Sequence, residues 1–122
     1  MKILLLAAAL TMTTAATAQT IPKFKKDAPY TVVREQLLRA GFLAEQLPVA
    51  ESDRCAPGRT EMCITFPETR WCLGTGKATC EFVLRNPRGG LIQVTAEGES
   101  EDPAVQTIKR LSDRDISRLM AE

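Results

Sequence analysis

Apolar and polar residues follow two different periods along this chain, and each period predicts one kind of element. After Pro29, apolar residues recur at Val33, Leu37 and Ala40, which are the i, i+4 and i+7 positions of one helix face. Proline is favoured in the first turn of a helix, and a glycine such as Gly41 commonly follows the last turn. The pattern therefore predicts an amphipathic helix that starts at Pro29 and stops at Gly41.

An alternation of apolar and polar residues, which has a period of two, begins near residue 78. The apolar positions of residues 80–84 alternate with their neighbours, and the alternation resumes over residues 92–96. Between them, residues 86–90 contain Asn, Pro and two Gly. This pattern predicts a β-hairpin over residues 78–97 with a five-residue turn, in which one face packs and the other is solvated.

Two segments before this hairpin give weaker signals. Residues 42–50 alternate loosely around Pro48, which predicts a short strand at a sheet edge because proline cannot donate to the ladder. Residues 51–77 are rich in Pro and Gly and are expected to be irregular. Within them, residues 59–66 fit either a short helix or a strand.

The C-terminal part also contains a segment whose pattern fits both a helix and a strand. A helical spacing of apolar residues over 104–111 follows the helix-start pattern Asp102-Pro103, but the β-branched residues of the same segment favour a strand nearly as strongly. Both interpretations stay open. Ser112 followed by Asp115 resembles a capping box and predicts a last helical segment.

The first residues have the pattern of a secretory signal peptide. Lys2 precedes an apolar run over residues 3–10, and Ala16-Thr17-Ala18 provides a cleavage site. An apolar run of this length is far short of the roughly 20 residues that span a bilayer, so no membrane span is expected after cleavage. The predicted organisation is a signal peptide (1–18), a flexible leader (19–28) and a single α+β domain (29–122).

Composition excludes several classes of function. The 122 residues include no His, so the chain cannot build a Ser-His-Asp triad, a Cys-His pair or a His-ligated metal site. Lys and Arg number 16 against 15 Asp and Glu, whereas a nucleic-acid-binding surface needs a strong basic excess. Neither a cofactor nor a nucleic-acid partner is expected.

All four cysteines, Cys55, Cys63, Cys72 and Cys80, lie within residues 55–80. An even number of cysteines in an exported chain predicts two disulfides. The spacing has neither the tight knuckles of a thiolate zinc site nor a Cys-x-x-Cys pair, so no metal site is expected. Of the three connectivities, Cys55–Cys63 with Cys72–Cys80 is favoured, because Pro and Gly residues let each short loop turn back. The predicted fold is an N-terminal helix packed on a small antiparallel sheet with a disulfide-pinned loop.

The one Trp of the chain, Trp71, directly precedes Cys72. Packing against a disulfide would bury the indole, whereas exposure on a disulfide-stiffened loop would make it the anchor of a binding surface. Arg70 and Arg59 are its expected polar neighbours. Trp71, Arg70 and Arg59 are therefore the predicted binding residues.

Two alternative functions rest on charged side chains. A basic cluster in the leader predicts binding to a cell-wall polymer through Lys23, Lys25 and Lys26. Three glutamates near the cysteines would serve a small hydrolase if the fold brought them together: Glu61, Glu68 and Glu81.

Two loops resemble ligand-binding motifs but depart from them. Residues 74–77 read Gly-Thr-Gly-Lys, but a phosphate loop needs Gly at position 71 and Ser or Thr at position 78, where this chain has Trp71 and Ala78. The acidic run over residues 97–102 lacks the ligand spacing of a Ca²⁺ loop. A tight turn and a solvated loop are expected instead.

Several short motifs carry a resemblance: Arg39-Ala40-Gly41-Phe42, Phe66-Pro67-Glu68, Gly74-Thr75-Gly76 and Cys80-Glu81-Phe82. In these the chain resembles a group of small uncharacterised exported bacterial proteins with four cysteines, a resemblance that implies no known activity. Residues 32–49 are also similar to wall-binding PASTA modules and to small helix-plus-sheet inhibitor domains. The PASTA pattern does not account for the cysteines.

These observations favour a non-catalytic binding protein of the periplasm or the extracellular space. Its expected role is that of an inhibitor or accessory factor of another envelope protein, without enzymatic activity. A cell-wall-binding or polymer-binding module is the first alternative, and a small hydrolase is the second.

Overall fold

The computed structural model describes residues 8–11, 20–46 and 54–121 of the chain. Along these residues the elements are, in chain order, α1 (Tyr30–Arg39), α2 (Thr60–Thr65), β1 (Thr69–Cys72), β2 (Cys80–Arg85), β3 (Leu91–Glu97), β4 (Ala104–Arg110) and α3 (Asp113–Ala121). Only residues 8–11 of the predicted signal peptide lie in the described part. No helix of the described ranges is both long enough and apolar enough to cross a bilayer.

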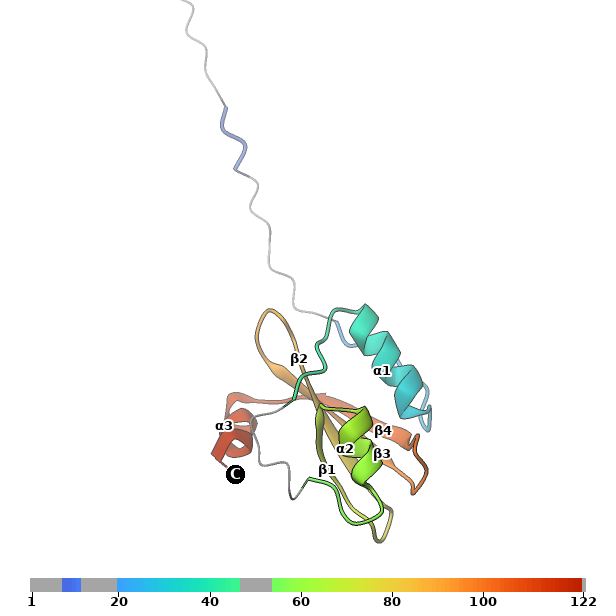
Figure 1. Ribbon diagram of the computed structural model, residues 1–122. Coiled ribbons are helices and arrows are strands. Elements are labelled where there is room, and N and C mark those ends of the chain that lie inside the picture. The colour runs from blue at the N-terminus through green and yellow to red at the C-terminus, as the bar shows by residue number, and fades with distance from the viewer. Residues whose placement is uncertain (1–7, 12–19, 47–53, 122) are drawn as a thin grey trace, which may run out of the picture.

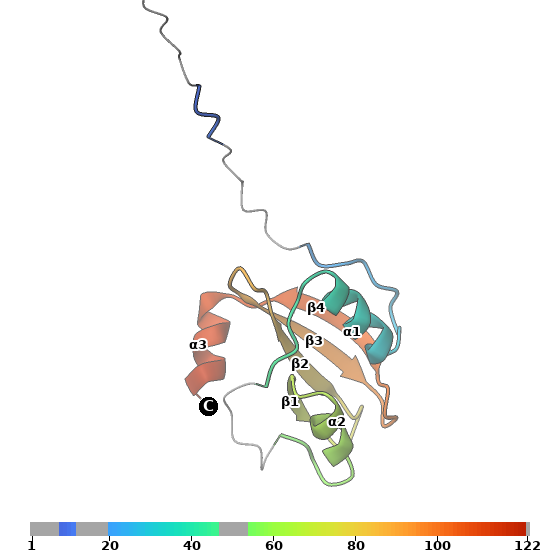
Figure 2. The same cartoon turned by 45° about the horizontal axis from the view of Figure 1, so that its top comes forward.

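The four strands form one antiparallel sheet in the order β1-β2-β3-β4, so each strand pairs with its neighbour in sequence. α1 lies over β3 and β4, and α2 lies beside β1 (Figure 1, Figure 2). One core joins α1 and α2 to the inner face of the sheet, and its largest members are Tyr30, Val33, Leu37, Phe42, Met62, Phe66, Phe82, Leu84, Ile92, Val94 and Val105. The predicted α+β fold, with an N-terminal helix on an antiparallel sheet, is confirmed.

The first helix forms where the apolar period predicts it. Val33 and Leu37 are buried against the sheet, and Gly41 has a φ of 97°, the left-handed conformation that often follows a helix. Pro29 offers no capping side chain at the N-terminus. The N–H of Thr31 instead donates to the carboxylate of Asp102 at 2.9 Å, so a distant loop satisfies a first-turn donor.

The predicted hairpin over residues 78–97 is confirmed, but the expectation of one solvated face is wrong for β2, where Glu81 and Val83 on the second face are 4% and 1% exposed. β2 and β3 pair continuously from Cys80, opposite Ala96, to the turn at residues 86–90. Both glycines of that turn have positive φ. Alternate residues of β3 are buried, as its period of two predicts.

The divided signal at residues 104–111 is resolved in favour of a strand, so Asp102-Pro103 does not start a helix. β4 pairs with β3, and an irregularity in the register leaves Gln106 without a partner residue. This bulge places Val105 and Ile108 on the core side, although residues three apart in a regular strand face opposite ways. The helical spacing of these apolar residues is therefore the signature of a bulged strand.

The two weak signals before the hairpin have different outcomes. Residues 59–66 contain the helix α2. In the predicted strand over residues 42–50, Leu43 forms a single antiparallel bridge with Arg85, and residues 47–50 lie outside the described part. Phe42 is 1% exposed, so this short stretch fills the end of the core.

Residues 20–28, expected to be a flexible leader, contact the domain. Ile21 and Phe24 pack against the core, and the N–H of Asp27 donates to the C=O of Val105 at 3.0 Å. The N–H of Val105 donates in return to the C=O of Ala28 at 2.8 Å. The segment thus covers part of the outer edge of β4, which explains why it does not extend into solvent.

The capping box predicted before the last helix is confirmed. The N–H of Asp115 donates to the Oγ of Ser112 at 3.1 Å, and the N–H of Ser112 donates to the Asp115 carboxylate at 3.1 Å. The hydrogen bonds from the backbone and then from the hydroxyl of Ser112 lower the pKa of Asp115. α3 begins directly after Ser112.

Candidate functional site

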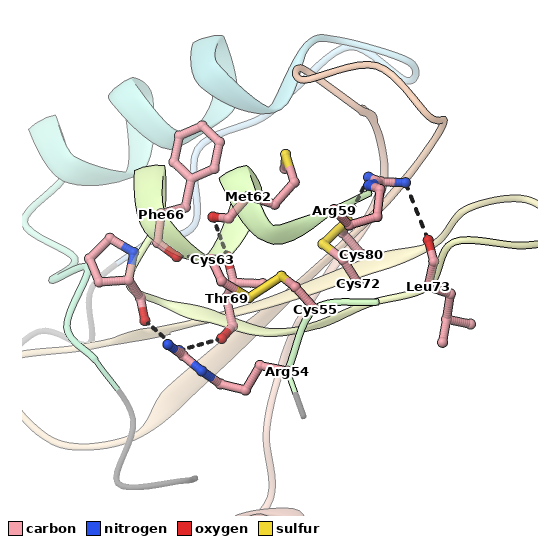
Figure 3. The surroundings of a disulfide bond; sticks show 11 residues. Arg54, Cys55, Arg59, Met62, Cys63, Phe66, Thr69, Cys72, Leu73 and Cys80 are labelled. Carbon is pink, nitrogen blue, oxygen red and sulfur yellow. Dashed lines mark hydrogen bonds between the residues drawn. A yellow bond between two sulfur atoms is a disulfide. The ribbon is translucent and has the colours of Figure 1, made fainter. Parts of the chain in front are cut away.

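Both disulfides have the favoured pairing, Cys55–Cys63 and Cys72–Cys80. The first joins α2 to the chain that runs beside β1, and its Cα atoms are 6.2 Å apart. The second bridges directly opposed residues of β1 and β2, with a Cα–Cα distance of 4.1 Å. Together they fix α2 and β1 to the rest of the sheet (Figure 3).

Arg54 and its neighbours cover the outer edge of β1. The N–H of Cys72 donates to the C=O of Arg54 at 2.8 Å, and the N–H of Ala56 donates to the C=O of Cys72 at 3.0 Å. The Nη1 of Arg54 donates to the C=O of Pro67 at 3.2 Å and of Thr69 at 3.0 Å, as Figure 3 shows. This edge therefore offers few free groups for pairing with another strand.

Arg59, one of the three predicted binding residues, is only 6% exposed. Its guanidinium donates to the C=O of Leu73 at 3.3 Å and to the Sγ of Cys80 at 2.9 Å (Figure 3). It also donates to the C=O of Ala78 at 3.2 Å. These contacts hold the turn between β1 and β2 against the second disulfide. Arg59 is thus part of the fold and offers no surface to a partner, contrary to the expectation from sequence.

Trp71 and Arg70 lie on the face of the sheet opposite to the one that α2 covers. Trp71 pairs with Glu81, whose neighbours along β2 point into the core, and a bulge precedes Trp71 in β1. The Nη1 of Arg70 donates to the carboxylate of Glu81 at 3.1 Å. Trp71 is half-buried. The structure therefore brings Trp71 and Arg70 together and separates both from Arg59.

A buried polar cluster joins α1 to β1. Glu68 is fully buried, and one of its oxygens accepts from the hydroxyl of Tyr30 at 2.7 Å and from the Nε of Arg34 at 2.5 Å. The guanidinium of Arg34 also lies 5.3 Å from the centre of the Phe66 ring. From the sequence, Glu68 was expected only as a possible hydrolase residue. The i, i+4 spacing of Tyr30 and Arg34 is the signal that could have indicated their common partner.

Burial and charge shift two pKa values in this cluster. Burial raises the pKa of Tyr30, and the charge of Glu68 and the hydrogen bond to it raise it further. Burial alone lowers the pKa of Arg34, but the hydrogen bond and charge of Glu68 outweigh it, so the pKa is raised. Tyr30 therefore stays a neutral donor and Arg34 a cation.

The three glutamates considered for a hydrolase do not converge. Glu61 is exposed on α2, Glu68 is buried on the core side of the sheet, and Glu81 is buried on the other side with Arg70. In the described ranges no group of three or more Cys, Asp and Glu side chains is placed to hold a metal ion. The arrangement offers no pair of facing carboxylates for glycoside hydrolysis from this set.

The outer side of α2 forms a ridge between two hollows. Ile64 lies on this outer side of α2 and is 68% exposed. A hollow of about 350 Å³ on one side is lined by Gln46, Arg54, Thr60, Cys63, Ile64 and Pro67. A second hollow, of about 300 Å³, is lined by Thr31, Glu61, Met62, Thr65, Phe66, Glu101 and Asp102. We call α2 with these two hollows the α2 surface. No sequence signal indicated it, because its residues come from five separate segments of the chain.

The other sequence candidates lie at the surface as turns or charged side chains. Residues 74–77 are an exposed turn between β1 and β2, and residues 98–102 form the loop between β3 and β4. The three lysines of the basic cluster are all exposed: Lys23, Lys25 and Lys26.

Comparison of this chain with protein-family models, with curated proteins and with solved structures finds no match. The resemblances noted from the sequence therefore stay predictions.

Proposed function

We propose that this protein is exported and binds another protein of the envelope or the extracellular space without catalysis, as an inhibitor or accessory factor. The observation that carries the proposal is the exposure of Ile64 on a short helix that Cys55–Cys63 pins to the sheet. An isoleucine exposed to 68% between two hollows is a surface feature that a partner can bury with a gain in free energy.

The rigidity of α2 supports a binding role. A helix of six residues is too short to be stable by itself. Besides the disulfide, the hydroxyl of Thr69 bonds to the C=O of Met62 at 3.2 Å and of Phe66 at 2.6 Å, which fixes the helix C-terminus on β1. A surface that is already ordered loses little conformational entropy on association, so contact there is converted efficiently into affinity.

Two features support export. Residues 1–18 have the order of a charged start, an apolar run and a small-residue cleavage site that a signal peptide requires. The two disulfides are of the kind that persist in oxidising compartments.

Affinity capture followed by titration tests the proposal. Oxidised mature protein serves as bait in a periplasmic extract of the source organism, and the enriched protein is then purified and its Kd measured. We expect Ile64→Asp to weaken binding at least tenfold, because it places a charge in a buried contact. Val32→Asp is the matched control, since Val32 is also exposed, to 48%, but lies on α1. Equal binding by wild type and Ile64→Asp would contradict the α2 surface.

The surface of Trp71 and Arg70 is the alternative contact within the same function. Trp71→Ala removes the indole from the opposite face of the sheet, and Ile64→Asp leaves that face unchanged. If the Kd changes more for Trp71→Ala, with the folded fraction of both variants verified, the partner binds the face predicted from sequence.

A second candidate function is binding to an anionic wall polymer. It is favoured by the packing of Ile21 and Phe24, because this packing fixes the exposed lysines of residues 23–26 to the domain instead of leaving them on a free tail. Such binding would weaken as salt rises, because exposed charges are screened. Retention on cell-wall material that does not depend on salt, or on these lysines, would exclude it.

A further inference from the structure

The hollow on the Arg54 side of α2 is lined by a buried cation that has no counter-charge among the described residues. Arg54 is 7% exposed, and its hydrogen bonds to Pro67 and Thr69 both come from Nη1. Its Nε is buried and has no partner. Among the residues that the structure describes, no carboxylate forms an ion pair with Arg54. Burying a charge is costly unless it is paired, so this guanidinium has an unused capacity to bind an anion.

Arg59 provides a comparison, because it also forms no ion pair with a described carboxylate but makes more hydrogen bonds. It is buried to the same degree, at 6% exposed, but its Nη1 and Nη2 together reach three acceptors. Arg59 also does not line the hollow. The two arginines therefore have similar burial, but only Arg54 has a buried nitrogen without a hydrogen-bond partner.

We propose that the hollow beside Arg54 binds a carboxylate that the protein partner presents, from an Asp or Glu side chain or from its C-terminus. This proposal rests on the proposed function, because it places the carboxylate on the α2 surface. The Nη2 of Arg54 makes no hydrogen bond to a described residue, and a guanidinium N–H forms a strong, charge-assisted hydrogen bond to a carboxylate oxygen.

The other lining residues fit this ligand. The hydroxyl of Thr60 can donate a further hydrogen bond, while Ile64 and Pro67 provide an apolar wall for the carbon chain that carries the carboxylate. One guanidinium supplies one positive charge, which is the charge needed for one carboxylate. An acidic residue beside an aliphatic residue would therefore contact both Arg54 and the exposed Ile64.

Nuclear magnetic resonance of the arginine side chains tests the proposal on the wild-type protein. The Nε–H signals of Arg54 and Arg59 are followed during titration with sodium acetate, with acetyl-Leu-Asp and with sodium chloride at equal ionic strength. We expect a saturable shift of the Arg54 signal with acetate and with the dipeptide, and no shift with chloride. The Arg59 signal is the internal control and should not move.

Substitution of the apolar wall sharpens the result. The dipeptide should bind at least threefold more tightly than acetate in the wild type, because its leucine can contact Ile64. In Ile64→Ala that advantage should disappear while the acetate response of Arg54 remains. Ile64 is exposed, so this variant is expected to fold normally.

The carboxylates of Glu51 and Asp53 precede Arg54 in the sequence and lie outside the described residues. The variant Glu51→Gln/Asp53→Asn distinguishes them from a partner as the source of the carboxylate. If Arg54 responds to acetate only in this variant, the chain fills its own site and the proposal is overturned. No response in either protein, or an equal response to chloride, also overturns it. None of these failures affects the binding comparison of Ile64→Asp with Val32→Asp, which tests the proposed function separately.

Discussion

The two helices that pack on the sheet are held there by different means. α1 has ten residues and is held by apolar packing, in which the ring of Tyr30 stacks on Phe82 with centroids 3.7 Å apart and meets Phe66 edge to face at 5.0 Å. α2 has six residues, of which only Met62 is buried, and it is held by Cys55–Cys63 and by hydrogen bonds from Thr69.

This difference explains where a binding surface can form. A helix held by its apolar face must direct most of its large side chains inward, as Val33 and Leu37 do. A helix held by a covalent bond is released from that requirement, so an isoleucine can stay at the surface. The α2 surface is thus a consequence of fixing the backbone with a disulfide.

Truncation of one apolar side chain on each helix should give the largest contrast. Leu37→Ala removes a fully buried side chain of α1 and should cost about 2–5 kcal/mol of unfolding free energy. Ile64→Ala removes an exposed one of α2 and should change stability by less than about 0.5 kcal/mol. Urea denaturation measures both. Similar losses for the two variants would contradict the contrast between the helices.

Removal of the first disulfide should destabilise α2 much more than α1. Cys55→Ser/Cys63→Ser opens a loop with a sequence separation of 8. The expected loss is about 2–3 kcal/mol, because the unfolded chain regains conformational freedom. Amide hydrogen exchange should show that residues 60–65 lose protection while α1 keeps it. Equal loss of protection in both helices would mean that the disulfide stabilises the whole domain and not α2 in particular.

The buried cluster at the junction of the two regions should make a moderate contribution. Tyr30→Phe removes one donor from the fully buried carboxylate of Glu68, and a loss of about 1–3 kcal/mol is expected. Arg39→Gln, which breaks an exposed ion pair with Glu35 on the same helix, is the control and should cost no more than about 0.5 kcal/mol.

The raised pKa of Tyr30 gives this cluster a measurable pH dependence. Because the folded pKa lies above the unfolded value, the stabilisation is fully present below about pH 10 and is lost as the pH rises toward the folded pKa. Tyr30 is the only tyrosine, so absorbance reports its ionisation directly. We expect ionisation to accompany unfolding. Ionisation at an ordinary pH in the folded domain would contradict the burial of its hydroxyl.

The smallest predicted effect is the pH-dependent loss of the N-terminal cap of α3. It serves as a reference, because α3 lies outside the two helices compared above. The lowered pKa of Asp115 means that its capping interaction is present above the ordinary aspartate pKa of about 3.9 and is lost as the pH falls through the folded value. Residues 113–118 should then lose protection in hydrogen exchange while α2 does not. Asp115→Asn, which cannot titrate, should abolish this pH dependence.

The sequence predicted those parts of the structure that depend on local patterns. The period of apolar residues predicted α1, the alternation over residues 78–97 predicted β2 and β3, and Ser112 with Asp115 predicted the start of α3. The disulfide pairing was predicted as well, because each bridge closes a short loop. Each of these features is decided within about 20 residues.

The features that the sequence did not predict depend on contacts between distant segments. The bulge in β4 gave a strand the spacing of a helix, and its cause is the pairing with β3. Arg59 was predicted to be at the surface, but acceptors at Leu73 and Ala78 hold it inside. The same limit applies to the candidate site, because no local pattern places Arg54 beside α2.

The central claim is that the protein binds its partner through α2, and amide hydrogen exchange of the free domain and of the complex tests it most directly. The account predicts that partner binding adds protection at residues 54–56 and 60–65, and that residues 69–72 and 20–28 change little. Added protection at residues 69–72, or only at residues 20–28, would contradict it and would assign the contact to the surface of Trp71 or to the basic cluster instead.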